Sequence, residues 1–147
     1  MARKRSRARG WALQVLYAWE SRADRDRLPD MLSEFTANRR IGTEAKEYLE
    51  TLITTLDMYL ETIDDAIADS LLNWRMERLS IIDRNILRVA TAEMLHLAIP
   101  PRVVIQEALQ LAEKYSTTES PRFINGVLDA LMRRAGIDGT SRTGDTR

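Results

Sequence analysis

The sequence predicts an all-α protein, a compact bundle of six to seven helices. Apolar residues recur at the i, i+3, i+4, i+7 spacing of an amphipathic helix through most of the chain. Glycine and proline, six and four among 147 residues, fall mostly between these periodic segments. No run of four or more residues alternates strictly enough between apolar and polar types to favour a strand. Helices packed on helices around one core are therefore the expected architecture.

Three helices are predicted in the first half of the chain. The first covers residues 6–21, a short second helix follows, and the third covers residues 43–70 with no glycine or proline to interrupt it. Thr43 is suited to cap the third helix, and residues 38–42 form the loop before it. The apolar stripes of the three helices are Ala8, Trp11, Ala12, Val15, Leu16 and Trp19; then Leu28, Met31, Leu32 and Phe35; then Tyr48, Leu49, Leu52, Ile53, Leu56, Tyr59, Leu60, Ile63 and Ile67.

A less regular stretch, residues 71–79, is expected to contain a short turn around Trp74. Ser80 then caps a helix that Pro100 and Pro101 must stop, because proline lacks an amide donor and clashes with the preceding turn. The inward positions of that helix are Ile82, Ile86, Leu87, Ala90 and Met94.

Two further helices follow the proline pair. Residues 102–115 form the first, and its apolar face consists of Val104, Ala108, Leu111, Ala112 and Tyr115. Ser120 as a cap, with Pro121 at the first helical position, starts the second. Gly136 is suited to end it. Its inward residues are Ile124, Val127, Leu128 and Leu131.

Residues 1–136 are expected to form one domain, because a chain of this size buries about two-thirds of its unfolded surface. Residues 138–147 contain no apolar side chain to bury, and the segment 137–147 is expected to be a disordered tail. No apolar run approaches the roughly 20 residues that cross a bilayer. The basic N-terminus is not followed by the apolar segment of a signal peptide, so a cytoplasmic protein is expected.

Charge is unevenly distributed. The chain carries 22 basic and 22 acidic side chains, but the first ten residues hold five cations and no acid. The remaining 137 residues therefore carry 17 basic against 22 acidic side chains, a net charge of −5. A basic block on a mildly acidic body indicates a localised anionic partner.

The residues needed for catalysis, metals or cofactors are largely missing. The chain has no cysteine, and His96 is its one histidine. Glu93 and His96 have the Glu-x-x-His spacing of di-iron bundles, but such sites need that pair twice. Asp64 and Asp65 diverge by about 100° on a helix and are interpreted as a solvated face. No phosphate-binding glycine motif occurs. The sequence predicts neither an enzyme nor a cofactor or metal site.

The basic block, here called the arm, consists of Arg3, Lys4, Arg5, Arg7 and Arg9. It leads into a helix on which Arg9 and Gln14 lie off the apolar face and Tyr17 lies at its edge. Arginine binds phosphates and stacks on bases, and aromatic side chains stack on unpaired RNA bases. Two interpretations stay open from composition alone: an RNA contact, or a basic leader that merely keeps the chain soluble.

The start of the last predicted helix is a second candidate site. A helix N-terminus presents unpaired amides that suit a phosphate. Arg122 lies in the first turn, where a cation opposes the helix dipole and often faces an anion instead. Phe123 falls outside the apolar stripe. It is equally suited to stacking on a base and to covering the edge of the core.

Four segments resemble the NusB family of bacterial transcription antitermination factors. They are RARGWALQVLY at residues 7–17, DRNILRVATAE at 83–93, IPPRVVIQEALQLAEKY at 99–115 and SPRFINGVLD at 120–129. The resemblance covers roughly residues 5–134, and the block of phenylalanine, asparagine, glycine and aspartate after the proline is quite specific. It implies an all-helical fold in two packed subdomains.

The resemblance also implies a function. Members of this family pair with NusE, a small-subunit ribosomal protein, and bind the boxA element of nascent RNA. The complex helps RNA polymerase to read through terminators, chiefly in ribosomal RNA operons. Asp83 matches an acidic position at the NusE interface. The implied RNA-binding residues are Arg3, Lys4, Arg5, Arg7, Arg9, Gln14, Tyr17, Glu119, Arg122 and Phe123.

This sequence departs from the family pattern at two positions. Gly10 stands where glutamate is common, and it softens the junction of arm and helix, because glycine costs about 1 kcal/mol relative to alanine. Gln106 replaces a usual asparagine. Asn125 and Asp129 belong to the signature and are interpreted as residues that hold the fold.

Two alternatives to an RNA-binding adaptor stay open. One is a structural adaptor, as a monomer or as a homodimer that masks its RNA surface. The other is a NusB-like domain related to the RNA-binding front end of ribosomal RNA methyltransferases, which is disfavoured because 147 residues are too few to include a methyltransferase domain as well. If all five arm cations meet phosphates of single-stranded RNA, the log–log salt slope of binding is roughly −3.5.

Overall fold

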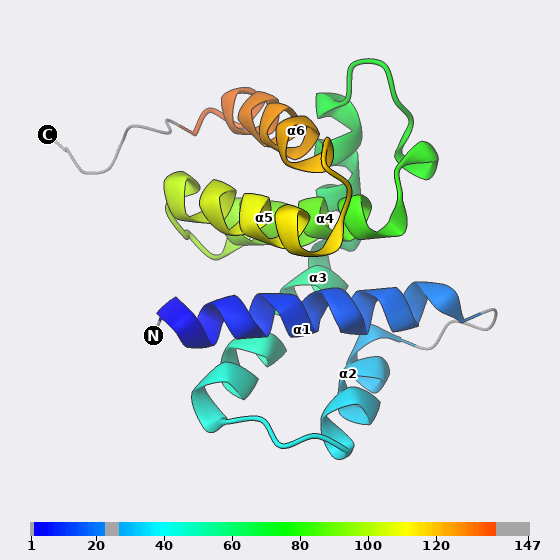
Figure 1. Ribbon diagram of the computed structural model, residues 1–147, viewed down its shortest axis with the longest axis vertical. Coiled ribbons are helices and arrows are strands. Elements are labelled where there is room, and N and C mark those ends of the chain that lie inside the picture. Colours follow the sequence, from blue (N-terminus) through cyan, green and yellow to red (C-terminus); the bar gives the residue numbers. More distant parts are fainter. Residues whose placement is uncertain (1, 23–26, 138–147) are drawn as a thin grey trace, which may run out of the picture. The chain divides into compact units, whose positions relative to one another are not determined.

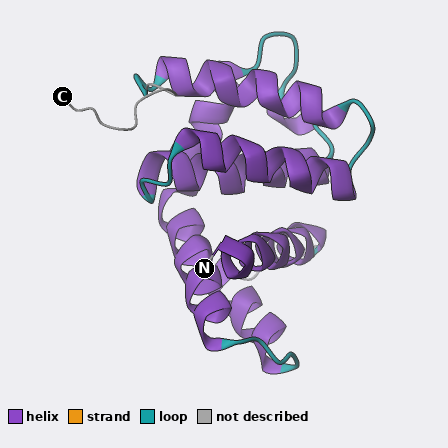
Figure 2. Cartoon of the chain, turned by 60° about the vertical axis from the view of Figure 1, so that its left-hand side comes forward, coloured by secondary structure: helices purple, strands orange, loops and turns teal. Residues whose placement is uncertain are grey.

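A computed structural model describes residues 2–22 and 27–137. Within these residues it contains α-helices and one short 3₁₀ helix, and no strand, so the predicted all-α class is confirmed (Figure 1, Figure 2). The chain divides into two compact units, residues 1–60 and 61–147, called the first and second units below. The elements are α1 (Ala2–Ser21), α2 (Leu28–Ala37), α3 (Thr43–Ser70), η1 (Met76–Arg78), α4 (Ile81–His96), α5 (Pro101–Tyr115) and α6 (Ser120–Arg134).

The first unit consists of α1, α2 and the first part of α3. α2 packs against α1 (Figure 1). Most residues of the apolar stripes predicted for these three helices are buried in the unit. Its buried apolar residues are Ala8, Ala12, Leu13, Val15, Leu16, Trp19, Leu28, Met31, Phe35, Ala45, Leu49, Leu52, Ile53 and Leu56. Burial of these side chains supplies the main stabilisation of a helical unit of this size.

The arm is part of α1, which begins at Ala2 and runs through Gly10 without a break. The predicted start at Ser6 was therefore four residues late. Arg9 is also placed differently from expectation. It is 3% exposed, so the prediction that it lies off the buried face is wrong. Apolar periodicity cannot place such a residue, since arginine can bury its aliphatic stem beside aromatic rings.

α3 is not uniform along its length. Tyr59 has φ −119° and ψ 21°, outside the helical range, although no proline or glycine is nearby. This kink lies beside the boundary between the two units. Tyr59 is 39% exposed, which corrects its placement in the buried stripe.

In the second unit, α4 is the central helix, and both α5 and α6 pack against it and against each other (Figure 1). α4 is buried on every side from Asn85 to Met94, as expected of a helix in the interior of a unit. One predicted core residue is misplaced: Tyr115, at the end of α5, is 43% exposed.

The ends of α4 show one confirmed prediction and one correction. Ser80 caps the helix, and its hydroxyl accepts a hydrogen bond from the Asp83 amide at 3.1 Å. The helix ends at His96, and Ala98 adopts a positive φ of 54°. The proline pair therefore does not stop α4. Instead Pro101 begins α5, where its missing amide costs nothing.

α6 begins at Ser120, but the predicted serine cap is not formed. Glu119 occupies the N-cap position without a side-chain cap bond. The other end is as predicted. Gly136 adopts a positive φ of 73°. Its amide donates a hydrogen bond to the Arg133 carbonyl, and the Ile137 amide donates one to the Met132 carbonyl. These two bonds define a Schellman motif. Ile137 thus belongs to the helix terminator. The rest of the predicted tail, 138–147, lies outside the described residues.

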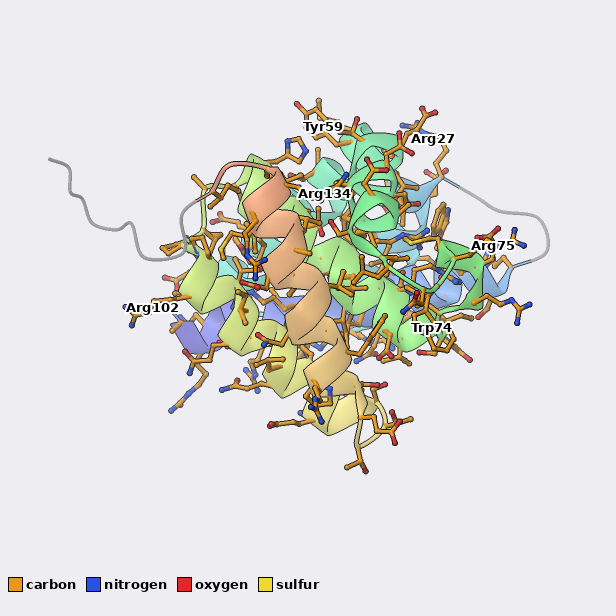
Figure 3. All side chains as sticks on the ribbon, turned by 90° about the horizontal axis from the view of Figure 1, so that it is seen from above. Arg27, Tyr59, Trp74, Arg75, Arg102 and Arg134 are labelled. Carbon is orange, nitrogen blue, oxygen red and sulfur yellow. The ribbon has the colours of Figure 1, made fainter. Side chains whose placement is uncertain are left out.

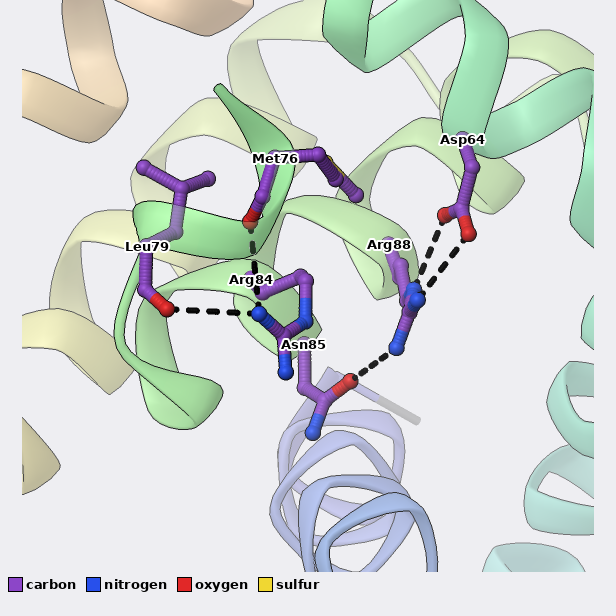
Figure 4. Close-up of polar contacts among 6 residues, drawn as sticks. All are labelled: Asp64, Met76, Leu79, Arg84, Asn85 and Arg88. Atoms are coloured by element: carbon purple, nitrogen blue, oxygen red, sulfur yellow. Dashed lines mark hydrogen bonds and ion pairs between the residues drawn. The ribbon is translucent and has the colours of Figure 1, made fainter. Parts of the chain in front are cut away.

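A buried polar network joins α3 to α4 inside the second unit (Figure 4). The Arg88 guanidinium donates to both Asp64 carboxylate oxygens, at 2.8 and 2.9 Å, and to Asn85 Oδ1 at 3.0 Å. The Arg88 side chain is 7% exposed. Asp64 is therefore a structural ion-pair partner, which corrects its interpretation as a solvated acid, whereas Asp65 is exposed as expected.

Candidate nucleic-acid interface

The arm is fastened to the start of α3 by charge and by an aromatic ring. Lys4 Nζ lies 3.0 Å from a carboxylate oxygen of Glu44. The guanidinium carbons of Arg5 and Arg9 lie 4.8 and 5.7 Å from the centroid of the Tyr48 ring. Cations at such distances are attracted by the ring quadrupole. Tyr48 therefore holds two arm arginines at once.

These contacts leave the arm cations in different states. Arg3 and Arg7 are exposed and form no ion pair or hydrogen bond with other described residues. Lys4 is exposed but paired, and its hydrogen bond and charge hold the pKa of the Glu44 carboxyl below its ordinary value. Arg5 is half-buried on Tyr48. Arg3 and Arg7 are the cations that offer phosphates the most accessible donors.

Gln14 and Tyr17 lie further along α1, and both are exposed. Tyr17 retains 50% of its surface. Both residues line a cavity of about 630 Å³ between α1 and α2 whose other residues include Phe35, Asn38 and Arg39. An exposed ring beside amide groups has the chemistry to stack on a base and bond its edge.

In the second unit, Asp83 sits at the centre of a hydroxyl network. Its carboxylate accepts hydrogen bonds from Ser116 Oγ at 2.7 Å and from Ser120 Oγ at 3.0 Å. Ser120 Oγ is also 3.0 Å from Thr117 Oγ1. The network ties the start of α4 to the turn between α5 and α6. It also places a carboxylate beside the helix start interpreted above as a phosphate site, and that charge opposes an incoming phosphate.

A second cavity, of about 330 Å³, lies next to this network. Asp83, Glu119 and Phe123 line it together with Trp74 and Arg78. Trp74, labelled in Figure 3, is 57% exposed. Phe123 is half-buried, and Arg122 points to solvent. Within the second unit, the structure thus brings together three of the four predicted site residues.

Sequence reasoning missed three residues that shape these sites. Tyr48 was placed in the core stripe because its spacing fits, and Arg39 was left in a loop. Trp74 was recognised only as part of an irregular stretch; the structure places the short turn at Met76–Arg78. One available signal was the presence of a tryptophan outside any apolar periodicity, since surface aromatics are frequent in binding sites.

The described residues hold neither a cluster of metal ligands nor a helix that could span a membrane. No three or more histidine, aspartate or glutamate side chains gather in a way that suits a metal ion. No helix among the described residues has both the length and the apolar character needed to cross a membrane.

Together with the all-helical fold, the basic arm and the aromatic cavities indicate the class of helical nucleic-acid-binding proteins.

The comparisons with known proteins agree with this class. A model described as the NusB family matches residues 6–133. Transcription antitermination protein NusB of Anaeromyxobacter sp. (strain Fw109-5) is 38% identical over 146 residues, 99% of each chain. The protein of that name from Chloroherpeton thalassium is 39% identical over 138 residues, 92% of this chain and 64% of that longer relative.

A solved structure is also similar. It is a crystal structure of antitermination factors NusB and NusE in complex with dsRNA, and the matching chain is 31% identical. The TM-score is 0.79, and the match covers 91% of this chain and 99% of that one. The chain described here belongs to the NusB family.

Proposed function

We propose that this protein is a transcription antitermination factor. It binds the boxA element of nascent RNA together with NusE and promotes read-through by RNA polymerase, chiefly in ribosomal RNA operons. The observation that carries the proposal is the arm, a helix that presents Arg3 and Arg7 to solvent without acidic partners among the described residues. Family membership and the solved NusB–NusE complex with dsRNA support it.

The proposed RNA contacts differ in kind. Arg3, Lys4 and Arg7 bind phosphates, Arg5 contributes from its place on the Tyr48 ring, and Arg9 contributes mainly by holding the arm. Gln14 and Tyr17 contact bases from α1. In the second unit, the proposed RNA contacts are Glu119, Arg122 and Phe123, and Asp83 contributes to the NusE interface.

The direct test is a titration of boxA-like RNA and of a scrambled RNA of equal composition, each with and without NusE. We expect the protein to prefer the boxA-like RNA, and NusE to raise its affinity. Equal affinity for both RNAs under both conditions would leave only non-specific charge binding.

The salt dependence of binding tests the role of the arm. With Arg9 buried and Arg5 held on a ring, about three arm cations remain for phosphates, so we expect a log–log slope of roughly −2 for single-stranded RNA. The double variant Arg3→Ala/Arg7→Ala should flatten the slope by about 1.4. The matched control, Arg102→Ala/Arg134→Ala, removes two surface arginines of the second unit (Figure 3) and should leave the slope unchanged. An equal change in both variants would contradict the assignment to the arm.

A further inference from the structure

The cavity between α1 and α2 has features that the arm lacks. Its volume is about 630 Å³, which lies within the range of ligand sites. Tyr17 lines it from α1, and Phe35 and Arg39 line it from the end of α2 and the turn that follows. All of these residues belong to the first unit.

The guanidinium of Arg39 lies over an aromatic ring. Its guanidinium carbon lies 3.9 Å from the centroid of the Phe35 ring, and Nη1 donates to the Phe35 carbonyl at 3.0 Å. The residue is exposed and has no carboxylate partner among the described residues. A guanidinium fixed in this way loses little entropy when a second planar group stacks on its open face.

Polar groups stand around this platform. The side-chain amides of Gln14 and Asn38 make no hydrogen bond within the described part of the chain. Amides of this kind donate to and accept from the edges of bases. Glu34 also lines the cavity, but it is paired with Arg22, which reduces its repulsion of an RNA chain.

We infer that this cavity is a subsite for one unpaired base of the bound RNA, which stacks on the Arg39 guanidinium beside Tyr17 while Gln14 and Asn38 bond its edge. The cavity shares Gln14 and Tyr17 with the RNA surface proposed above, so a strand that follows α1 from the arm passes it. The inference rests on the proposed RNA-binding function, and it adds the turn after α2 to that surface.

A thermodynamic cycle between the protein and the RNA tests the subsite. boxA-like RNAs that lack one base at each position in turn are titrated, in the presence of NusE, against the unmodified protein and against Arg39→Ala. We expect one position at which base removal weakens binding by roughly tenfold in the unmodified protein, a typical stacking contribution. In Arg39→Ala the same removal should cost almost nothing, because the stacking partner is already missing.

Two further variants separate stacking from charge. Arg40→Ala removes the neighbouring exposed arginine and should keep the full tenfold penalty of base removal. Arg39→Lys keeps the charge but not the planar group, so it should behave as Arg39→Ala does. Wild-type behaviour of Arg39→Lys, or the absence of any RNA position coupled to Arg39, would overturn the subsite while leaving RNA binding by the arm intact. Failure of the unmodified protein to bind any RNA would overturn the proposed function as well.

Discussion

Two arrangements of arginine in this protein, one in each unit, are opposite in kind. In the second unit, Arg88 is buried and both Asp64 carboxylate oxygens accept its hydrogen bonds. In the first unit, Arg5 and Arg9 are held by the face of the Tyr48 ring. A carboxylate accepts hydrogen bonds from the guanidinium donors, whereas a ring beneath a half-exposed guanidinium, such as that of Arg5, leaves the N–H groups at its rim available.

This difference separates cations that serve the fold from cations that serve a ligand. Arg88 cannot bind an RNA phosphate without giving up its structural partner, Asp64. The arm can, because its contacts with α3 fix where the cations are without neutralising all of them. Arg39 on Phe35 follows the same principle as Arg5 on Tyr48. Variants that remove the Asp64 carboxylate or the Tyr48 ring break one of these two arrangements each.

The largest effect is expected from Asp64→Ala. It leaves the Arg88 guanidinium buried without its carboxylate, which should lower the free energy of unfolding by about 3 kcal/mol. The value is at the low end for buried pairs because Asp64 is 28% exposed and water can reach the vacated side. Urea denaturation followed by circular dichroism measures the change.

Asp65→Ala is the matched control for that variant. It removes the neighbouring, exposed acid and should change stability by less than about 0.5 kcal/mol. Under conditions where the Asp64→Ala variant remains folded, the affinity of that variant for RNA should equal the affinity of the unmodified protein. A stability loss of equal size in the two variants would show that helix α3, not the ion pair, is sensitive at this point.

A smaller effect, expressed in RNA binding, is expected from Tyr48→Leu. Leucine retains apolar contact but lacks the ring quadrupole, so two cation–π contacts of about 0.5–1 kcal/mol each are lost. RNA affinity should fall by several-fold, and the Cα chemical shifts of residues 2–9 should move toward coil values. Tyr48→Phe keeps the ring, so both the RNA affinity and the chemical shifts of residues 2–9 should stay as in the unmodified protein. If Tyr48→Phe resembles Tyr48→Leu, the hydroxyl and not the ring face positions the arm.

The sequence predicts the helices of this protein far better than it predicts the roles of their charged residues. Apolar periodicity located α2 through α6 because burial of apolar stripes decides where helices form. The same periodicity placed Tyr48 in the core and Asp64 in solvent. Both errors have one cause: the partners, Arg5 and Arg88, are distant in sequence, and pairing across helices leaves no local pattern.

Capping and end signals were predicted with mixed success for a related reason. Ser80 and Gly136 act within their own turn, so local sequence suffices. Ser120 has the same local signature as a cap, but its hydroxyl bonds Asp83 instead. The α1 start was missed because the residues that extend the helix, one alanine and three cations at positions 2–5, form no apolar stripe. Their helix is supported by contacts with α3 that the sequence does not display.

The smallest expected effect concerns the outermost attachment of the arm, the pair of Lys4 and Glu44. Lys4 favours the charged carboxylate and holds the pKa of Glu44 below its ordinary value of 4.5. A lowered pKa means that the pair stabilises the arm above about pH 4.5 and that this contribution is lost as the pH falls through the folded-state value. Cα chemical shifts of residues 2–9 should therefore be constant from pH 7 to 5 and drift toward coil values only at lower pH.

Glu44→Gln should remove this acid transition, whereas Glu50→Gln, an exposed change on the same helix, should retain it. Because both side chains of the pair keep more than half of their surface exposed to solvent, added salt should weaken the pair as well. An acid transition that survives in Glu44→Gln would assign the pH dependence to another group and leave the Tyr48 ring as the main attachment of the arm.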